Sequence, residues 1–265
     1  MGALTAEIDA LRAVAAAGAA VAHDGFRGQL EIEQKGGETD LVTHIDRAAQ
    51  TAVVEAIQTR FTDAHIVGEE GMLPKQLPAA GTAWVVDPID GTHNFIRGRR
   101  LFATAVGLVV DGAPRAGTSA FPAMGDVYHT DGETVWRNDT AVRVSGVTDP
   151  HGAIIAPLLW WEHDDRDQYA ALVAALVRRF ADIRRIGAAQ AVLAQIAEGA
   201  IDGAVATTRG HPWDTVGGVA MVRAAGGRVT DLHGAPWEPD AVGMVASNGR
   251  LHEQLLAVAG DVVDG

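Results

Sequence analysis

The sequence predicts a mixed protein of the α+β or α/β class, in which strands and helices follow one another along most of the chain. Two observations predict it. Short apolar runs alternate with longer segments whose apolar residues recur at helical spacing. Two of the apolar runs, 101–110 and 113–120, are separated only by Asp111-Gly112, which is typical of a tight hairpin turn. The 265 residues are enough for one large domain or two modest ones.

The first 70 residues predict two helices, each followed later by a short strand. The predicted helices span residues 4–22 and 43–61, and the predicted strands span residues 29–33 and 65–67. Thr43 is the expected N-cap of the second helix, with Asp46 in its first turn. The second strand runs directly into the acidic pair Glu69-Glu70, which is framed by glycines.

The most informative stretch is an apolar strand that ends in the motif Asp-Pro-Ile-Asp-Gly-Thr at residues 87–92. Pro88 has no N–H to donate to a sheet, so the strand is expected to end at Asp87. Asp90 is then expected at the N-cap of a short helix. Backbone amides at a helix start suit a phosphate, and carboxylate oxygens suit Mg²⁺. The motif therefore predicts Mg²⁺-assisted attack on a phosphate ester.

The second half of the chain predicts a regular alternation of strands and helices. After the hairpin, residues 125–144 predict further short strands, and Pro150 is a candidate boundary. This boundary divides the chain into an N-terminal half, 1–150, and a C-terminal half, 151–265. The predicted strands of the C-terminal half span 153–155, 183–186, 203–207, 227–230 and 242–246, and the predicted helices span 167–180, 188–198 and 213–225, with a last helix from Asn248 or Gly249.

Composition limits the possible functions. The formal net charge of −13 disfavours nonspecific nucleic-acid binding, which needs basic residues to neutralise phosphates. The absence of cysteine excludes disulfides, thiolate zinc sites and a cysteine nucleophile. No apolar run approaches the roughly 20 residues of a membrane span, and the charged N-terminal segment is typical of a helix, not a signal peptide. A cytoplasmic protein without membrane contact is the expectation.

Acidic residues recur at the ends of the predicted apolar elements. They are Asp46, Glu69, Asp87, Asp90 and Asp214. Asp214 follows Pro212 in the first turn of a predicted helix, where proline is favourable. A packed α/β fold can bring such ends together, and carboxylates that meet repel one another unless a cation intervenes. Because all the donors are oxygens, Mg²⁺ is favoured over zinc. Taken singly, Asp46 and Asp214 are also explained as surface acids at helix starts.

Four blocks of the sequence resemble the inositol monophosphatase family of Mg²⁺-dependent, lithium-sensitive phosphatases. The blocks are Asp40-Leu41-Val42-Thr43 with Asp46, Gly68-Glu69-Glu70, Asp87 to Thr92 with Asn94-Phe95, and Trp213-Asp214 with Ala225-Gly226-Gly227. The resemblance spans roughly residues 5 to 260. It implies a layered α-β-α-β-α sandwich, a homodimer, and hydrolysis of a small phosphorylated metabolite by a water molecule that metal ions activate.

The resemblance also implies residue roles. The implied ligands of two or three Mg²⁺ ions are Glu69, Asp87, the Ile89 carbonyl, Asp90 and Asp214. Glu69 is the implied activator of the attacking water, and Asp46 with Thr92 is implied to polarise a metal-bound water. Gly91, Thr92 and neighbouring amides are implied to hold the phosphate. Lys35 matches a basic residue that supports the metal or phosphate charge.

The substrate is less well defined by the resemblance. The resemblance implies substrate contacts at Asp90, Gly91, Thr92, Arg185, Ala188, Ala189 and Asp214. His93 and Arg209 are further candidate contacts, at positions where the sequence departs from the family pattern. His93 stands where many relatives have a threonine or another small or basic residue. The segment 204–210 lacks the glutamate with which many relatives hold substrate hydroxyls, and Arg209 is present there instead. Inositol phosphate, histidinol phosphate, a nucleotide 3′-phosphate and a sugar phosphate all stay open as substrates.

Other classes of function fit less well. A haloacid-dehalogenase-type phosphatase needs two acids one residue apart, whereas Asp87 and Asp90 are separated by two residues. None of the three serines lies in a nucleophile elbow, which argues against a serine hydrolase. A binding protein that keeps the fold but has lost turnover is the alternative from a different class, and the intact set of acids argues against it.

Overall fold

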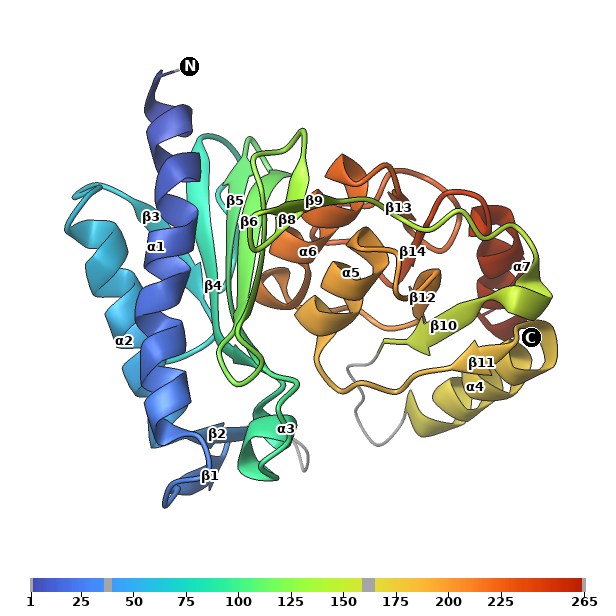
Figure 1. The fold of residues 1–265 in the computed structure, drawn as a ribbon, viewed down its shortest axis with the longest axis horizontal. Helices are drawn as coiled ribbons and strands as arrows, with labels where there is room; N and C mark the ends of the chain where they lie inside the picture. The colour runs from blue at the N-terminus through green and yellow to red at the C-terminus, as the bar shows by residue number, and fades with distance from the viewer. Residues whose placement is uncertain (1, 36–39, 159–164, 264–265) are drawn as a thin grey trace.

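The computed structural model describes residues 2–35, 40–158 and 165–263, and it shows five alternating layers of helices and sheets (Figure 1). The predicted mixed fold and the layered sandwich are confirmed. The helices are α1 (Gly2–Gly25), α2 (His44–Gln58), α3 (Thr92–Ile96), α4 (Arg166–Arg179), α5 (Ala189–Ala197), α6 (Pro212–Ala224) and α7 (His252–Val263), with a single 3₁₀ turn, η1, at Pro150–Gly152. None of the described helices has the length and apolar character needed to cross a bilayer.

A seven-stranded sheet forms the second layer, in the spatial order β3-β4-β5-β6-β7-β8-β9. Its strands are β3 (His65–Gly68), β4 (Thr82–Asp90), β5 (Ala103–Val110), β6 (Ala113–Phe121), β7 (Asp126–Thr130), β8 (Val135–Arg137) and β9 (Thr140–Val142). Only β3 and β4 pair in parallel. The predicted hairpin is present, because Asp111 and Gly112 both adopt positive φ between the paired ends of β5 and β6.

A five-stranded sheet forms the fourth layer, in the order β11-β10-β12-β14-β13. Its strands are β10 (Ile154–Pro157), β11 (Asp182–Ile183), β12 (Gly203–Ala206), β13 (Arg228–Thr230) and β14 (Met244–Ser247). A separate two-stranded ribbon pairs β1 (Ile32–Gln34) with β2 (Leu41–Thr43) beside the start of α2. The strand predicted at 183–186 is shorter than expected. The last helix also starts later, because the Asn248 side chain accepts the N–H groups of Arg250 and Leu251 in a preceding turn.

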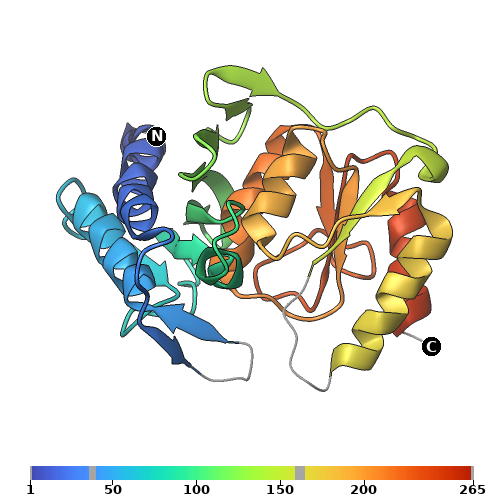
Figure 2. The same ribbon diagram turned by 60° about the horizontal axis from the view of Figure 1, so that its bottom comes forward.

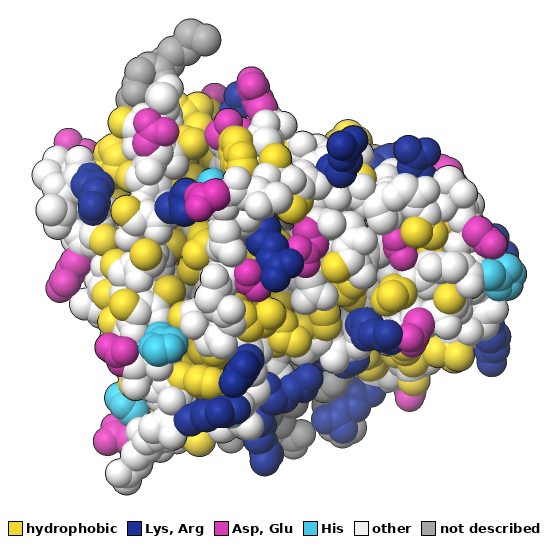
Figure 3. Space-filling model, in the orientation of Figure 1, with side chains coloured by type: hydrophobic (Ala, Val, Ile, Leu, Met, Phe, Trp, Pro, Cys, Tyr) yellow, Lys and Arg dark blue, Asp and Glu magenta, His cyan; other side chains and the backbone are white. Residues whose placement is uncertain are grey.

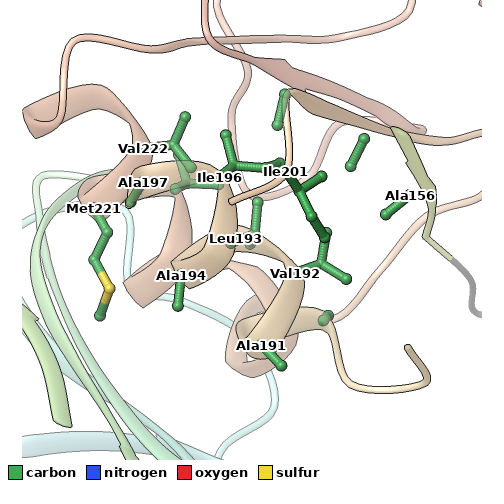
Figure 4. Close-up of a cluster of buried hydrophobic side chains, with 14 of the residues drawn as sticks. Ala156, Ala191, Val192, Leu193, Ala194, Ile196, Ala197, Ile201, Met221 and Val222 are labelled. Carbon is green, nitrogen blue, oxygen red and sulfur yellow. The ribbon is translucent and has the colours of Figure 1, made fainter. Parts of the chain in front are cut away.

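Helices α1 and α2 cover the outer face of the large sheet, and α4 and α7 cover the outer face of the small sheet (Figures 1 and 2). Helices α5 and α6 lie between the two sheets. Their apolar side chains, among them Leu193, Ile196 and Met221, form one buried cluster with residues of both sheets (Figure 4). Burial of this central layer on both faces explains why α5 is almost entirely apolar.

Helix α6 approaches the large sheet at glycines. A Cβ atom on Gly117 of β6 would lie 2.5 Å from the Cα atom of Gly217, and a Cβ on Gly107 of β5 would lie 3.1 Å from the Gly217 nitrogen. Side chains at these positions would push the helix away from the strands. The three glycines therefore set the distance between α6 and the sheet, and with it the position of the acid at the start of α6.

Candidate active site

The C-terminal end of β4 carries two of the predicted acids, and its geometry differs from the prediction in one respect. The strand continues to Asp90 instead of ending at Asp87. The pairing with β5 is irregular between these two residues, which accommodates the missing N–H of Pro88. The Thr104 hydroxyl donates a hydrogen bond of 2.8 Å to the Pro88 carbonyl at this irregularity. The irregular pairing thus accommodates the missing N–H of Pro88, while the Thr104 side chain satisfies its carbonyl.

Asp90 does not cap the short helix that follows it. The N-cap of α3 is Gly91, with φ of 90° and no side-chain cap. The Asp90 carboxylate turns to a helix distant in sequence, where Oδ1 accepts the Ala189 N–H at 2.9 Å and Oδ2 accepts the Gln190 N–H at 2.8 Å. Burial raises the pKa of Asp90 to about 6, although these N–H donors oppose the shift. Asp90 therefore joins β4 to the start of α5.

Asp87 is the centre of the acidic cluster. Its side chain is buried, and its Oδ1 atom has no hydrogen-bond partner. Burial raises the pKa of Asp87 well above its ordinary value, and the nearby carboxylates of Glu69, Asp90 and Asp214 raise it further. These four acids, which the sequence placed on three separate segments, lie close enough in the fold to affect one another's ionisation.

Glu69 and Glu70 stand directly after β3, beside Lys35. The Lys35 ammonium donates to Glu69 Oε1 at 2.8 Å and to Glu70 Oε1 at 2.7 Å. Burial raises the pKa of Glu69 to about 7, against the opposing charge of Lys35. The backbone of Glu70 is fixed from the other side, because its N–H and carbonyl each bond the Gln50 amide at 2.7 Å. The two carboxylates are therefore held in defined positions.

Asp46 and Thr92 form the hydrogen-bonded pair that the family resemblance implied. Asp46 is fully buried in the first turn of α2, where its Oδ2 accepts the N–H and hydroxyl of the predicted N-cap Thr43. Its Oδ1 lies 3.2 Å from the Thr92 hydroxyl, which lies equally far from the Ile89 carbonyl. The hydroxyl of Thr92 donates its one proton to Asp46 or to the Ile89 carbonyl. The lone pairs of the Thr92 oxygen can therefore accept a hydrogen bond from another group.

Asp214 lies in the first turn of α6, as predicted, with Pro212 at the first helical position. Its Oδ2 accepts the His211 N–H at 3.0 Å. The preceding Trp213 carbonyl accepts a hydrogen bond of 2.9 Å from the buried Gln190 side chain. Since the Gln190 N–H also bonds Asp90, one residue of α5 links the acid of β4 to the acid of α6.

The chemistry of this cluster fits a divalent cation. Every candidate ligand is a hard oxygen, and the buried, unpartnered Oδ1 of Asp87 is an unused acceptor among mutually repelling carboxylates. Within the described ranges, however, no three acidic or histidine side chains already stand in the arrangement of a bound ion. The ammonium of Lys35 holds Glu69 and Glu70 in this structure. Small side-chain movements would accompany metal binding at this site.

The predicted substrate residues divide into two groups. Ala188 and Ala189 lie at the site, since a Cβ on Gly91 would lie 3.0 Å from the Ala188 Cβ and the Ala189 N–H bonds Asp90. His93, Arg185 and Arg209 have exposed side chains. Arg209 lies on the loop between β12 and α6, and Arg185 interacts with Tyr169.

Sequence reasoning missed three residues of the site. Glu70 is buried and paired with Lys35, Gln190 connects two acids, and Lys75 donates to the backbone of the Glu69 turn. One signal was available in the sequence. The chain contains only two lysines among 21 basic residues, and both fold against the Glu69-Glu70 pair. The signal for Gln190 is not local, because its role depends on the packing of α5 against α6.

Three comparisons relate the chain to known proteins. A model of the inositol monophosphatase family matches residues 4–264. The chain is 32% identical over 229 residues to an inositol-1-monophosphatase of Bacillus subtilis, with 86% of each chain covered. It is 32% identical to a fructose-1,6-bisphosphatase/inositol-1-monophosphatase of Thermotoga maritima, with 88% of each covered. A solved Thermotoga maritima IMPase superposes with a TM-score of 0.86 at 29% identity, covering 100% of this chain and 99% of that one.

Proposed function

The chain belongs to the inositol monophosphatase family and is a phosphoric monoester hydrolase, and we propose that it hydrolyses a small phosphorylated metabolite, such as an inositol monophosphate, in a Mg²⁺-dependent reaction. One observation carries the proposal. Glu69, Asp90 and Asp214, which come from three different segments, gather around the buried carboxylate of Asp87, whose Oδ1 has no hydrogen-bond partner. A site for divalent cations explains this arrangement, because the acids destabilise one another when no cation is bound.

The proposed ligands of two or three Mg²⁺ ions are Glu69, Asp87, the Ile89 carbonyl, Asp90 and Asp214. When bound, the metal lowers the pKa of water and stabilises the charge on the leaving oxygen. Lys35 pairs with Glu69 and Glu70 and reduces the net negative charge that a phosphate ester meets on approach.

The chain's own groups then orient the water and the ester. Glu69, whose carboxylate is held by Lys35 beside Asp87, would accept the proton from the attacking water. The Thr92 hydroxyl, whose proton points to Asp46 or to the Ile89 carbonyl, offers its lone pairs to the same water. We propose that the amides that follow Gly91 hold the phosphate, and that water attacks it directly without a phosphorylated protein.

A phosphomonoester panel tests the proposed function. Wild-type protein is expected to release phosphate with Mg²⁺ and to lose this activity in excess EDTA. Asp87→Asn and Asp214→Asn are expected to lose at least a hundredfold in kcat while remaining folded by circular dichroism, since each removes a proposed ligand. The exposed Asp139→Asn is the matched control. Full turnover in EDTA, or in both ligand variants, would contradict the proposal. No phosphate release from any ester would favour a binding protein that has lost turnover.

A specific observation favours a sugar phosphate with a second anionic group as an alternative substrate. Arg99, Arg100, Leu101 and Met124 line a hollow of about 430 Å³. The Leu101 carbonyl lies 3.2 Å from the position of a Cβ on Gly91, so the hollow borders the proposed phosphate turn. Basic side chains gather at the lower edge of the face in Figure 3, in the area of α3. One relative is named a fructose-1,6-bisphosphatase/inositol-1-monophosphatase.

The panel therefore includes inositol monophosphate, histidinol phosphate, a nucleotide 3′-phosphate, and sugar mono- and bisphosphates. Arg209→Ala is expected to change the relative rates across the panel while leaving the Mg²⁺ dependence as in wild type. Unchanged relative rates would remove Arg209 from the specificity residues.

Arg100→Ala is expected to raise KM for the bisphosphate more than for the monophosphates.

We further propose that the protein is a homodimer, that lithium inhibits it and that it acts in the cytoplasm. Sedimentation equilibrium tests the oligomeric state, and a monomer at micromolar concentration would contradict the proposed homodimer.

We also propose that the chain consists of two halves. The N-terminal half, residues 1–150, supplies Glu69, Asp87 and Asp90. The C-terminal half, residues 151–265, supplies Asp214 and the Ala188-Ala189 wall of the site.

A further inference from the structure

The loop between β3 and β4 is fixed to the site at several points. The Gly68 N–H donates to the Pro74 carbonyl at 3.2 Å, and the Leu73 side chain lies so close to Gly68 that a Cβ there would be 2.6 Å from its Cδ1 atom. Leu77 packs against the buried cluster that contains Trp213. The loop thus touches both the turn that carries Glu69 and the helix start that carries Asp214.

Lys75 makes the polar contacts between these two segments. Its ammonium donates to the carbonyls of Gly68 and Glu69, each at 2.7 Å. The same nitrogen lies 5.5 Å from the centre of the Trp213 ring, within the range of a cation–π interaction. Partial burial lowers the pKa of Lys75, against the opposing charges of Glu70 and Glu69. One charged group therefore contacts the backbone on one side and an aromatic ring on the other.

Trp213 is a rigid partner for this contact. Its side chain is only 7% exposed, its ring stacks on His211 with a centroid separation of 4.6 Å, and its carbonyl accepts from Gln190. Asp214 is the next residue in the chain. A displacement of Trp213 would therefore move the carboxylate of Asp214 relative to Asp87.

We propose that Lys75 is a positioning residue that fastens the Glu69 turn to the Trp213-Asp214 start of α6. The proposal rests on the proposed function, because positioning matters only if these carboxylates act together. The two lysines of the chain contact different groups of the same turn. Lys35 bonds the carboxylates of Glu69 and Glu70, whereas Lys75 bonds the carbonyls behind them. Lys75 can thus hold the acids in place without competing with a cation for their oxygens.

Lys75→Met tests the inference, since it keeps an unbranched apolar stem and removes the ammonium. Lys75→Arg is the conservative variant, because a guanidinium can donate to two carbonyls and stack on tryptophan. The exposed neighbour Gln76→Met is the matched control. Hydrogen–deuterium exchange of the metal-free proteins is measured first. Lys75→Met is expected to raise exchange at least threefold in peptides that cover 68–71 and 211–216, while Gln76→Met exchanges as wild type.

Binding of Mn²⁺, followed by electron paramagnetic resonance, is the second measurement. Lys75→Met is expected to weaken it by about tenfold, as loss of a group that orients metal ligands does, with kcat restored at saturating metal. Lys75→Arg is expected to recover most of the affinity. Unchanged exchange in both segments of Lys75→Met would overturn the inference, as would equal metal affinity in wild type and Lys75→Met. If wild type binds no Mn²⁺, the proposed function fails, and the exchange data still decide whether Lys75 fastens the two segments.

Discussion

Two aspartates three residues apart have different physical surroundings in this protein. The carboxylate of Asp90 accepts two backbone N–H groups at the start of α5, whereas Asp87 has an unpartnered buried oxygen among like charges. The N–H donors thus offset part of the cost of burying Asp90 when no cation is bound, whereas Oδ1 of Asp87 has no such donor. The sequence motif alone gives no sign of this difference.

Asp87→Asn and Asp90→Asn are expected to separate these roles. In EDTA at pH 7, Asp87→Asn should raise the free energy of unfolding by about 1 kcal/mol, because it removes a repelled charge. Asp90→Asn should lower it by about 1 kcal/mol, because it weakens a helix cap. Thermal melts in EDTA measure both changes. Equal changes in the free energy of unfolding, with the same sign in both variants, would contradict the different surroundings of Asp87 and Asp90.

At the scale of elements, the position of α6 depends on the glycines that face it. Gly117→Ala is expected to lower stability by about 1–3 kcal/mol, as overpacking does, because its Cβ would meet the Gly217 backbone at 2.5 Å. The resulting shift of α6 should also raise the Mg²⁺ concentration for half-maximal activity. Gly146→Ala is the control, since nothing lies within 4 Å of its Cβ. A Gly117→Ala protein as stable as this control would contradict the close approach.

A buried histidine connects three elements of the small sheet. His252 of α7 lies 2.8 Å from the Ser247 hydroxyl of β14 and 2.9 Å from the Thr230 hydroxyl of β13. Thr230 donates its own proton to the Asp231 carbonyl, so its oxygen accepts from Nε2–H and Nδ1 accepts from Ser247. A second proton on the ring would force the Ser247 hydroxyl to turn its own proton away from Nδ1. Burial lowers the pKa of His252 to about 4.

This histidine predicts a loss of stability in acid. The unfolded chain takes up the proton near pH 6.5 and the folded chain only near pH 4, so the contribution is complete above pH 6.5 and is lost as the pH falls toward 4. Between pH 7.5 and pH 5 the loss should be about 2 kcal/mol. In denaturant titrations, His252→Gln should start less stable and lack this part of the pH dependence. The same pH dependence in both proteins would refute the assignment.

At the scale of the whole molecule, the site depends on packing between the two sheets. Four proposed ligands come from the large sheet and its edge, and Asp214 comes from the helix layer between the sheets. Because α5 and α6 bury apolar surface against both sheets, we expect one cooperative unfolding transition.

Saturating Mg²⁺ is expected to raise the midpoint of this single transition. At about 100 times the dissociation constant the gain is about 2.7 kcal/mol, or roughly 5–10 °C for a chain of this size. Scanning calorimetry with Mg²⁺ and with EDTA measures the shift. The Mg²⁺-dependent shift of the midpoint should be small in Asp214→Asn and as large as in wild type in Asp139→Asn. Two separate transitions, of which only one responds to Mg²⁺, would contradict a shared site.

Local patterns were sufficient to predict most elements and the acids Glu69, Asp87, Asp90 and Asp214, but they gave Glu70 no role. Asp111-Gly112 predicted the hairpin because its backbone preference is a property of two residues, and Thr43 predicted the helix start because an N-cap acts within three residues. The acidic motif at 87–92 predicted cation chemistry because oxygen donors have the same preference in any fold.

Only the tertiary structure decided which group each acid faces. The sequence pattern assigned Asp90 to the nearest helix, and in the fold it caps α5, about 100 residues away. Pro88 lies within a strand because the pairing with β5 is irregular at this point, and Thr104 of β5 donates the hydrogen bond to its carbonyl. Lys75 and Gln190 gained their roles from the loop and helices that pack around them. Contacts between residues distant in sequence form because whole layers of helices and sheets bury apolar surface against one another. The local preferences of single residues do not encode which layers meet.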